Sequence, residues 1–250
     1  MNLGNYWRSK FNRLALEDIP VWQKASWWYE YIVESQKRFV DDGLRKHSEG
    51  TQLLVADIGC GPGIIINQLV NSGHRAVGLD YSINSLKAAK KGTSPGSNYL
   101  INGDATFIPF KENVFDAVLY LGVMQTADNP ERQINQVSGL LRPKGVLLMT
   151  TLRQHSIWEL PFWAIHILSL QDHYPDRSNR NMEMIKNRSC LIPRPTDDAE
   201  QQLRRYSISQ IKTWLTKAGL HRISFKYDGP LDHFPRLSNS IMTYVRAYKK

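Results

Sequence analysis

The stretch from Leu53 to Gly63 constrains this chain more than any other part of the sequence. Its four apolar residues end in Asp57, three glycines then follow at alternate positions, and an isoleucine-rich segment begins at Ile64. An apolar run, a glycine turn and helix-compatible spacing predict a buried strand, a tight turn and a helix. Glycines let the backbone turn sharply and approach a ligand closely, and the start of the helix offers free N–H groups to the negative end of that ligand. The stretch therefore predicts a ligand-binding turn.

The spacing of the glycines separates this turn from a dinucleotide-binding turn. The dinucleotide pattern is G-x-G-x-x-G, whereas Gly59, Gly61 and Gly63 stand at alternate positions. Pro62 also lacks the N–H group that a pyrophosphate would use. Asp57 would repel a pyrophosphate but suits a ligand that carries an ammonium group. A Rossmann-like domain that binds another nucleotide stays open as the alternative.

Further segments follow the glycine turn and complete an α/β pattern. They are Val77–Ser82, Gly103–Phe110, Phe115–Tyr120 and Leu141–Leu148. Because the expected strands alternate with helices, we predict a doubly wound sheet of parallel strands. Ligands of such sheets bind at the carboxyl ends of the strands. These ends should therefore converge, and they are Asp57–Gly63, Asp80, Asp104 and Leu121–Gln125.

From residue 53 to residue 151, these segments resemble the class I S-adenosylmethionine (SAM)-dependent methyltransferases. They are most similar to the small-molecule type, such as the methyltransferase domain of ubiquinone and menaquinone biosynthesis. The resemblance implies SAM as cofactor and S-adenosylhomocysteine as its product. It also implies a Rossmann-like, doubly wound, seven-stranded sheet whose last strand is antiparallel.

The resemblance also implies roles for particular residues. Asp57 and the glycine turn would hold the amino-acid end of SAM. Asp80 would accept from both ribose hydroxyls, and Asp104 from the exocyclic amine of adenine. The residues expected to contact the cofactor are Asp57, Gly59, Cys60, Gly61, Gly63, Asp80, Tyr81, Ser82, Asp104, Ala105, Leu121 and Gln125. No metal site is expected.

The chain divides into four expected parts. Residues 1–50 form an N-terminal helical lid that is rich in aromatic side chains, and residues 51–151 form the SAM-binding core. Residues 152–205 are too long for a simple link and are interpreted as a substrate cap inserted after the fifth strand. Residues 206–250 supply a C-terminal helix and a β-hairpin that complete the core.

Local signals fix several boundaries within these parts. Ser82 is expected to cap a helix over Ile83–Lys91. Ser207 is a good N-cap for an amphipathic helix that ends at Gly219. Alternating apolar residues predict two strands, His221–Tyr227 and Ile241–Tyr248.

The acceptor side of the site is less well defined by the sequence. The residues expected to line it are Tyr6, Trp7, Trp27, Gln125, His155 and Trp158. His155 follows the fifth strand and is the candidate general base, which a hydroxyl or a protonated amine would require. The alternatives are that the histidine is structural and that the aromatic residues only pack against the sheet. Many relatives carry a pair of histidines near Gln125 and Thr126, which this chain lacks, so the acceptor chemistry stays open.

The charge distribution keeps more than one function in view. Of the net charge of +9, +7 lies in residues 171–250. We predict methyl transfer to oxygen or nitrogen of a small molecule, in specialised metabolism, with catalysis mainly by positioning of the reactants. One alternative is an RNA or protein methyltransferase that uses the basic C-terminal third. The other is a SAM-binding protein without methyl transfer.

The remaining features bear on partners and location. Nucleic acid is disfavoured as a partner because the chain lacks an added binding module and the Asn/Asp-Pro-Pro-Tyr/Phe motif of amino-directed nucleic-acid methyltransferases. The longest apolar stretch, Trp158–Leu170, is too short to span a bilayer. The chain has two cysteines, and Cys60 lies in the glycine turn. A structural disulfide is therefore not expected, and a reducing, cytoplasmic setting fits the sequence. The oligomeric state stays open.

Overall fold

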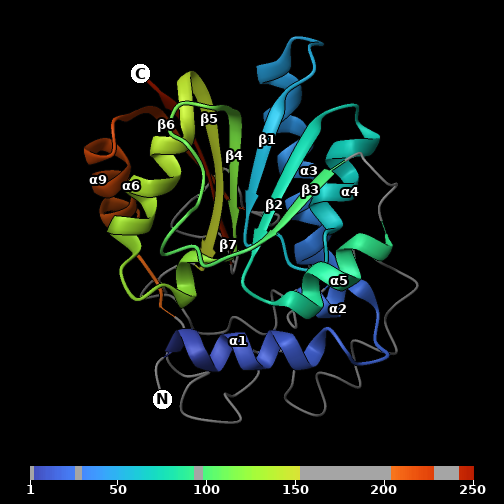
Figure 1. Cartoon of the computed structure of the whole chain (residues 1–250). Helices are drawn as coiled ribbons and strands as arrows, with labels where there is room; N and C mark the ends of the chain where they lie inside the picture. Colours follow the sequence, from blue (N-terminus) through green and yellow to red (C-terminus); the bar gives the residue numbers. More distant parts are fainter. Residues whose placement is uncertain (1–2, 26–29, 93–97, 153–203, 228–241) are drawn as a thin grey trace, which may run out of the picture.

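A seven-stranded sheet forms the centre of the protein (Figure 1). The computed structural model describes residues 3–25, 30–92, 98–152, 204–227 and 242–250. The strands follow the order β3-β2-β1-β4-β5-β7-β6 across the sheet. Their bounds are β1 Leu54–Ile58, β2 Arg75–Asp80, β3 Asn98–Asn102, β4 Phe115–Leu121, β5 Leu141–Leu152, β6 Leu220–Tyr227 and β7 Met242–Lys249. The predicted Rossmann-like sheet is confirmed.

The direction of the strands matches the prediction as well. Strands β1 to β5 pair in parallel. The last strand, β7, lies between β5 and β6 and is antiparallel to both. Strands β1 and β4 are neighbours although β2 and β3 lie between them in the sequence. This reversal of strand order places the ends of β1 and β4 beside one another, where an open α/β sheet binds its ligands.

Helices cover both faces of the sheet (Figure 1). Helices α3, α4 and α5 pack on one face, and α6 and α9 pack on the other. Two more helices, α1 and α2, precede α3, and a 3₁₀ turn, η1, follows β4. Their bounds are α1 Leu3–Leu14, α2 Val21–Ala25, α3 Glu30–Ser48, α4 Ile64–Asn71, α5 Ile83–Lys91, η1 Met124–Thr126, α6 Pro130–Leu140 and α9 Ile208–Lys217.

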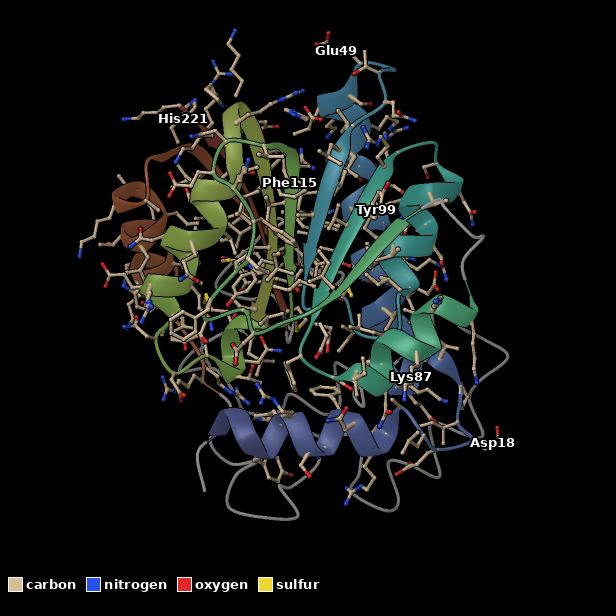
Figure 2. All side chains as sticks on the ribbon, viewed as in Figure 1. Asp18, Glu49, Lys87, Tyr99, Phe115 and His221 are labelled. Carbon is tan, nitrogen blue, oxygen red and sulfur yellow. The ribbon has the colours of Figure 1, made fainter. Side chains whose placement is uncertain are left out.

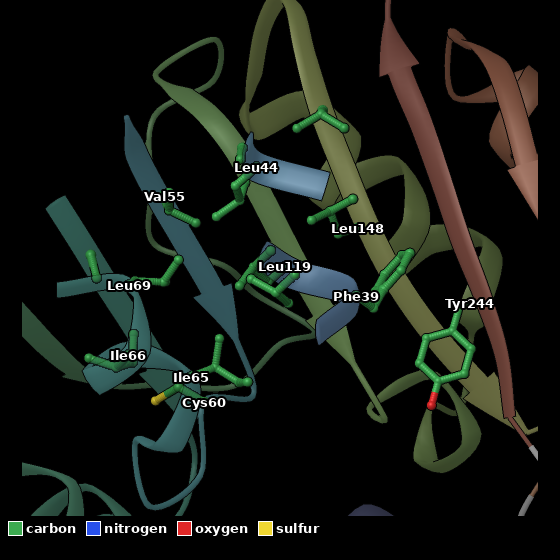
Figure 3. Close-up of a cluster of buried hydrophobic side chains, with 14 of the residues drawn as sticks. Phe39, Leu44, Val55, Cys60, Ile65, Ile66, Leu69, Leu119, Leu148 and Tyr244 are labelled. Carbon is green, nitrogen blue, oxygen red and sulfur yellow. The ribbon is translucent and has the colours of Figure 1, made fainter. Parts of the chain in front are cut away.

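Side chains that alternate along the strands build two apolar cores. In β1, Val55 faces the core beneath α3 and α4, and Ala56 faces the core beneath α6 and α9. In β5, Leu148 faces the core beneath α3 and α4, and Leu147 faces the core beneath α6 and α9. Figure 3 shows the first core, which contains Val55 and Leu148 together with Phe39 of α3. Because both faces are buried, the strands are continuous apolar runs in the sequence.

Two predicted helix caps are present. The Ser82 hydroxyl accepts from the N–H of Ser85 at 3.1 Å, and α5 spans the predicted residues. The Ser207 hydroxyl accepts from the N–H of Gln210 at 3.2 Å, while the Gln210 side chain accepts from the N–H of Ser207 at 3.0 Å. This reciprocal capping box fixes the start of α9. The helix ends at Lys217, just before Gly219, whose φ is +79°.

The described part of the chain contains no helix that is both long enough and apolar enough to cross a membrane. The helical character predicted for much of residues 1–50 is confirmed by α1, α2 and α3. The cap predicted at 152–205 lies almost wholly outside the described residues.

Candidate functional site

The glycine turn between β1 and α4 has a backbone that few other residues could adopt. The φ angles of Gly59, Gly61 and Gly63 are +82°, +53° and +81°. A Cβ atom on Gly59 would lie 2.3 Å from Cγ2 of Val123, and one on Gly63 would lie 2.7 Å from Cβ of Ala89. The turn therefore needs glycine both for its left-handed conformation and for its close packing against neighbouring segments.

Asp80, at the end of β2, ties the glycine turn to the start of α5. Its Oδ2 atom accepts from the N–H of Gly61 at 2.8 Å, and its Oδ1 atom accepts from the N–H of Ser82 at 2.8 Å. Burial raises the pKa of Asp80, and the two N–H donors partly offset that rise. The carboxylate is thus positioned by two backbone groups at the point where two strand ends meet.

Asp57, at the carboxyl end of β1, is a second buried acid in this region. Asp57 is 2% exposed to solvent. Burial, together with the nearby Asp80 carboxylate, raises the pKa of Asp57 to about 7. Two buried carboxylates that disfavour each other's charge would be stabilised by a cationic group placed beside them. This is the chemistry expected of a site for an ammonium group.

Asp104 follows β3 and joins the same edge. Its Oδ1 atom accepts from both the N–H and the hydroxyl of Thr106, each at 2.8 Å. Its Oδ2 atom lies 3.1 Å from Nη2 of Arg8. Two further bonds connect β3 to β2, because the N–H of Gly103 and the side chain of Asn102 donate to the carbonyl of Asp80. Ala105 is half-buried and packs toward the core beneath α6.

Helix α1 lies across this edge of the sheet (Figure 1). Oδ1 of Asn12 accepts from the hydroxyl of Ser82 at 2.7 Å, and the carbonyl of Asn12 accepts from the side chain of Asn84 at 3.3 Å. The guanidinium of Arg8 lies 5.5 Å from the centroid of the Tyr81 ring. Figure 2 shows side chains between α1 and the ends of the strands. Sequence reasoning missed Arg8 and Asn12, because no local pattern marks them.

The segment after β4 carries uncharged polar groups. Gly122, next to Leu121, has a φ of +71° and donates to the carbonyl of Thr150 at 3.1 Å. Gln125 is 7% exposed, and its Oε1 atom has no hydrogen-bond partner among the described residues. Gln36 of α3, which the sequence gave no reason to select, donates to the hydroxyl of Thr150 at 3.1 Å.

Other predicted site residues have a mixed outcome. Cys60 turns its side chain into the core of Figure 3, so only its backbone is available at the turn. Trp7 is 1% exposed, and its ring centroid lies 5.2 Å from that of Tyr6 and 5.8 Å from that of Phe11. This arrangement favours packing as the role of Trp7. The predicted residues Trp27, His155 and Trp158 lie outside the described part of the chain.

The structure therefore brings most of the expected cofactor residues to one edge of the sheet. Hydrogen bonds, electrostatic contacts or adjacency in the sequence link these residues to one another. They are the glycine turn, Asp57, Asp80, Tyr81, Ser82 and Asp104. Buried acids and a turn that lacks side chains fit a ligand with an ammonium group and several hydrogen-bond donors. SAM has these features, so the residues present fit this cofactor.

Comparison with known proteins leads to the same family. Residues 56–149 match a family model described as a methyltransferase domain. The chain is 23% identical over 197 residues to the demethylmenaquinone methyltransferase of Renibacterium salmoninarum, covering 78% of this chain and 74% of that protein. It is 34% identical over 188 residues to an uncharacterized protein of Methanocaldococcus jannaschii, covering 72% of this chain and 68% of that protein.

A similar fold occurs in the 1,6-didemethyltoxoflavin-N1-methyltransferase of Burkholderia thailandensis, whose structure contains bound 1,6-didemethyltoxoflavin and S-adenosylhomocysteine. The TM-score is 0.62 at 14% sequence identity, and the match covers 99% of this chain and 88% of that one. At this level of identity, the likeness shows the fold.

Proposed function

Because this chain belongs to the class I SAM-dependent methyltransferases, we propose that it transfers a methyl group from SAM to an oxygen or nitrogen atom of a small molecule. The observation that carries the proposal is the position of α1. This helix lies over the strand ends and contacts both α5 and η1, so it leaves less room at this edge for a large substrate. The names of two similar proteins, which refer to demethylmenaquinone and to 1,6-didemethyltoxoflavin, support a small acceptor.

We assign the cofactor contacts by the chemistry of the strand ends. SAM supplies a methyl group on a positively charged sulfur, which is already activated for transfer. Asp57 would hold the ammonium group, and Asp80 would accept from the ribose hydroxyls. Asp104 would accept from the adenine amine. The glycine turn would let the backbone lie close to the amino-acid end of the cofactor. The protein then contributes mainly the alignment of the acceptor atom with the methyl group and the sulfur.

Gln125 and Gln36 are our candidates for the acceptor side. Both carry uncharged amides, and these flank Gly122, whose added Cβ would lie 3.4 Å from Nε2 of Gln125 and 3.9 Å from Nε2 of Gln36. A buried amide oxygen without a hydrogen-bond partner is stabilised when a donor reaches it. A methyl acceptor with an N–H or O–H group supplies such a hydrogen-bond donor. His155 as a general base, the cap over 152–205 and a role in specialised metabolism stay predictions.

Transfer of labelled methyl groups tests this function against its alternatives. The purified protein is incubated with methyl-labelled SAM and a cell extract separated into small molecules, RNA and protein. We expect the label in the small-molecule fraction. Label in RNA or protein would instead support the alternative that uses the basic C-terminal third. Cofactor binding without labelling of any fraction would identify a SAM-binding protein that does not transfer methyl groups.

Cofactor affinity is expected to depend on pH through Asp57. Its pKa of about 7 is raised, so the carboxyl is largely protonated below pH 7 in the free protein. Because the ammonium group of S-adenosylhomocysteine favours the ionised form, binding should tighten about tenfold from pH 6 to pH 8. Calorimetric titration over this range checks the result.

An Asp57→Asn variant is the control, since it should bind more weakly at pH 8 and show a flat profile. The neighbouring groups that titrate or carry charge are Asp80 and Cys60, and burial raises the pKa of both. A wild-type profile that also stays flat would contradict the role assigned to Asp57.

A further inference from the structure

Arg8 of α1 contacts two residues of the candidate cofactor site, Asp104 and Tyr81, at the same time. Its Nη2 atom lies 3.1 Å from Oδ2 of Asp104, and its guanidinium carbon lies 5.5 Å from the centroid of the Tyr81 ring. Asp104 follows β3, and Tyr81 follows β2. A side chain from the N-terminal helix therefore bridges the ends of two neighbouring strands.

The oxygen that Arg8 contacts is the one that Asp104 has available for a ligand. Oδ1 of Asp104 already accepts two hydrogen bonds from Thr106, at 2.8 Å each. Oδ2 is left for another donor, and Arg8 supplies it. An adenine amine that approached Asp104 would need this same oxygen.

The shape of the guanidinium strengthens this comparison. It is planar, donates N–H groups in its own plane and stacks on aromatic rings. Adenine is also planar, and its exocyclic amine donates in the plane of the ring. Arg8 lies over Tyr81 and donates to Asp104, as a bound adenine would if these two residues contact it. The two groups therefore suit the same position beside Asp104 and Tyr81.

The position of Arg8 is set by a second residue of α1. Asn12 lies one helical turn further on, on the same side of the helix. It holds α1 to the start of α5 through Ser82 and Asn84, with bonds of 2.7 and 3.3 Å. This anchor directs Arg8 toward the end of β3.

We propose that Arg8 competes with the adenine ring for Asp104 and Tyr81, and so sets the affinity of the protein for its cofactor. The inference rests on the proposed function to the extent that it takes these two residues as adenine contacts. Binding of the cofactor requires Arg8 to leave Asp104. The apparent affinity is therefore that of a site without Arg8 multiplied by the fraction of molecules in which Arg8 has left Asp104.

Titration of S-adenosylhomocysteine into three forms of the full chain tests this inference. The forms are the wild type, Arg8→Met and Arg13→Met. Arg13 is the matched control, because it lies on the same helix, has a side chain that is 74% exposed and, among the residues that the structure describes, forms an ion pair only with Glu17, one helical turn away. The Arg8–Asp104 pair is about half exposed, so its contribution is modest. We expect Arg8→Met to bind about twofold to fivefold more tightly than the wild type and Arg13→Met to bind unchanged. Unchanged or weaker binding by Arg8→Met would overturn the proposal.

Salt provides a second readout that a purely structural role would not produce. S-adenosylhomocysteine carries no net charge near neutral pH, whereas the Arg8–Asp104 pair weakens as salt rises. Raising the sodium chloride concentration should therefore increase the affinity of the wild type relative to that of Arg8→Met, and an equal salt dependence of the two forms also counts against the competition. A protein that binds S-adenosylhomocysteine and shows this pattern but methylates no small molecule would refute the proposed function alone.

Discussion

Replacement of Asp80 by asparagine is expected to weaken binding of S-adenosylhomocysteine by about 100-fold or more. The two oxygens of Asp80 each accept from a backbone N–H at 2.8 Å, in the glycine turn and at the start of α5. Asparagine offers one acceptor oxygen, and its NH₂ group would face the other N–H. Bonds to a charged acceptor contribute about 1.5–3 kcal/mol each, and the proposed ribose contact is lost as well. Isothermal titration calorimetry measures the change.

Asp116→Asn provides a matched control for this variant. Asp116 is also a buried carboxylate on a strand, and it accepts from the N–H of Leu54 at 2.7 Å. It follows Phe115 at the start of β4, and Phe115 is labelled in Figure 2 at the end of β4 that is remote from α1. Both variants should unfold at lower urea concentration than the wild type, but only Asp80→Asn should lose affinity. Wild-type affinity in folded Asp80→Asn would remove the basis for the cofactor site.

Replacement of Gly59 by alanine should destabilise the fold by about 2–5 kcal/mol. An alanine there adopts the left-handed conformation, because φ is +82°, and its Cβ would lie 2.3 Å from Cγ2 of Val123. The conformation costs about 1–2 kcal/mol, and overpacking adds about 1–3 kcal/mol. Since valine is stiff at χ1, relief requires movement of the segment after β4. The free energy of unfolding is obtained from urea denaturation.

Two further variants separate the causes of this loss. Gly73 has the same φ of +82°, and a Cβ atom there would meet nothing within 4 Å. Gly73→Ala should therefore lose only about 1–2 kcal/mol. Shortening the opposing side chain in the double variant Gly59→Ala, Val123→Ala should recover part of the stability. Equal losses at Gly59 and Gly73 would show that collision with Val123 plays no part.

The outcome at the strand ends illustrates why much of the site could be predicted. Asp57, Asp80 and the glycine turn lie within short stretches where residue type, spacing and strand pattern coincide. The caps at Ser82 and Ser207 were predictable for the same reason, since a hydroxyl before an amphipathic run acts within one helical turn. The parallel sheet with an antiparallel last strand followed from the family resemblance together with the rules of parallel sheets.

Sequence alone determined the glycine turn, the acids at the strand ends and the alternation of strands and helices, because each depends on residues close together in the chain. Only the tertiary structure decided which distant residues reach that edge. Arg8 meets Asp104, 96 positions further along the chain, and Gln36 meets Thr150, 114 positions further along. Neither pair has a local signal, since a helix can lie across a sheet in many ways and the packed fold selects one of them. The acids that we propose to hold the cofactor are thus readable in the sequence, whereas the position of Arg8 beside Asp104 is defined by packing.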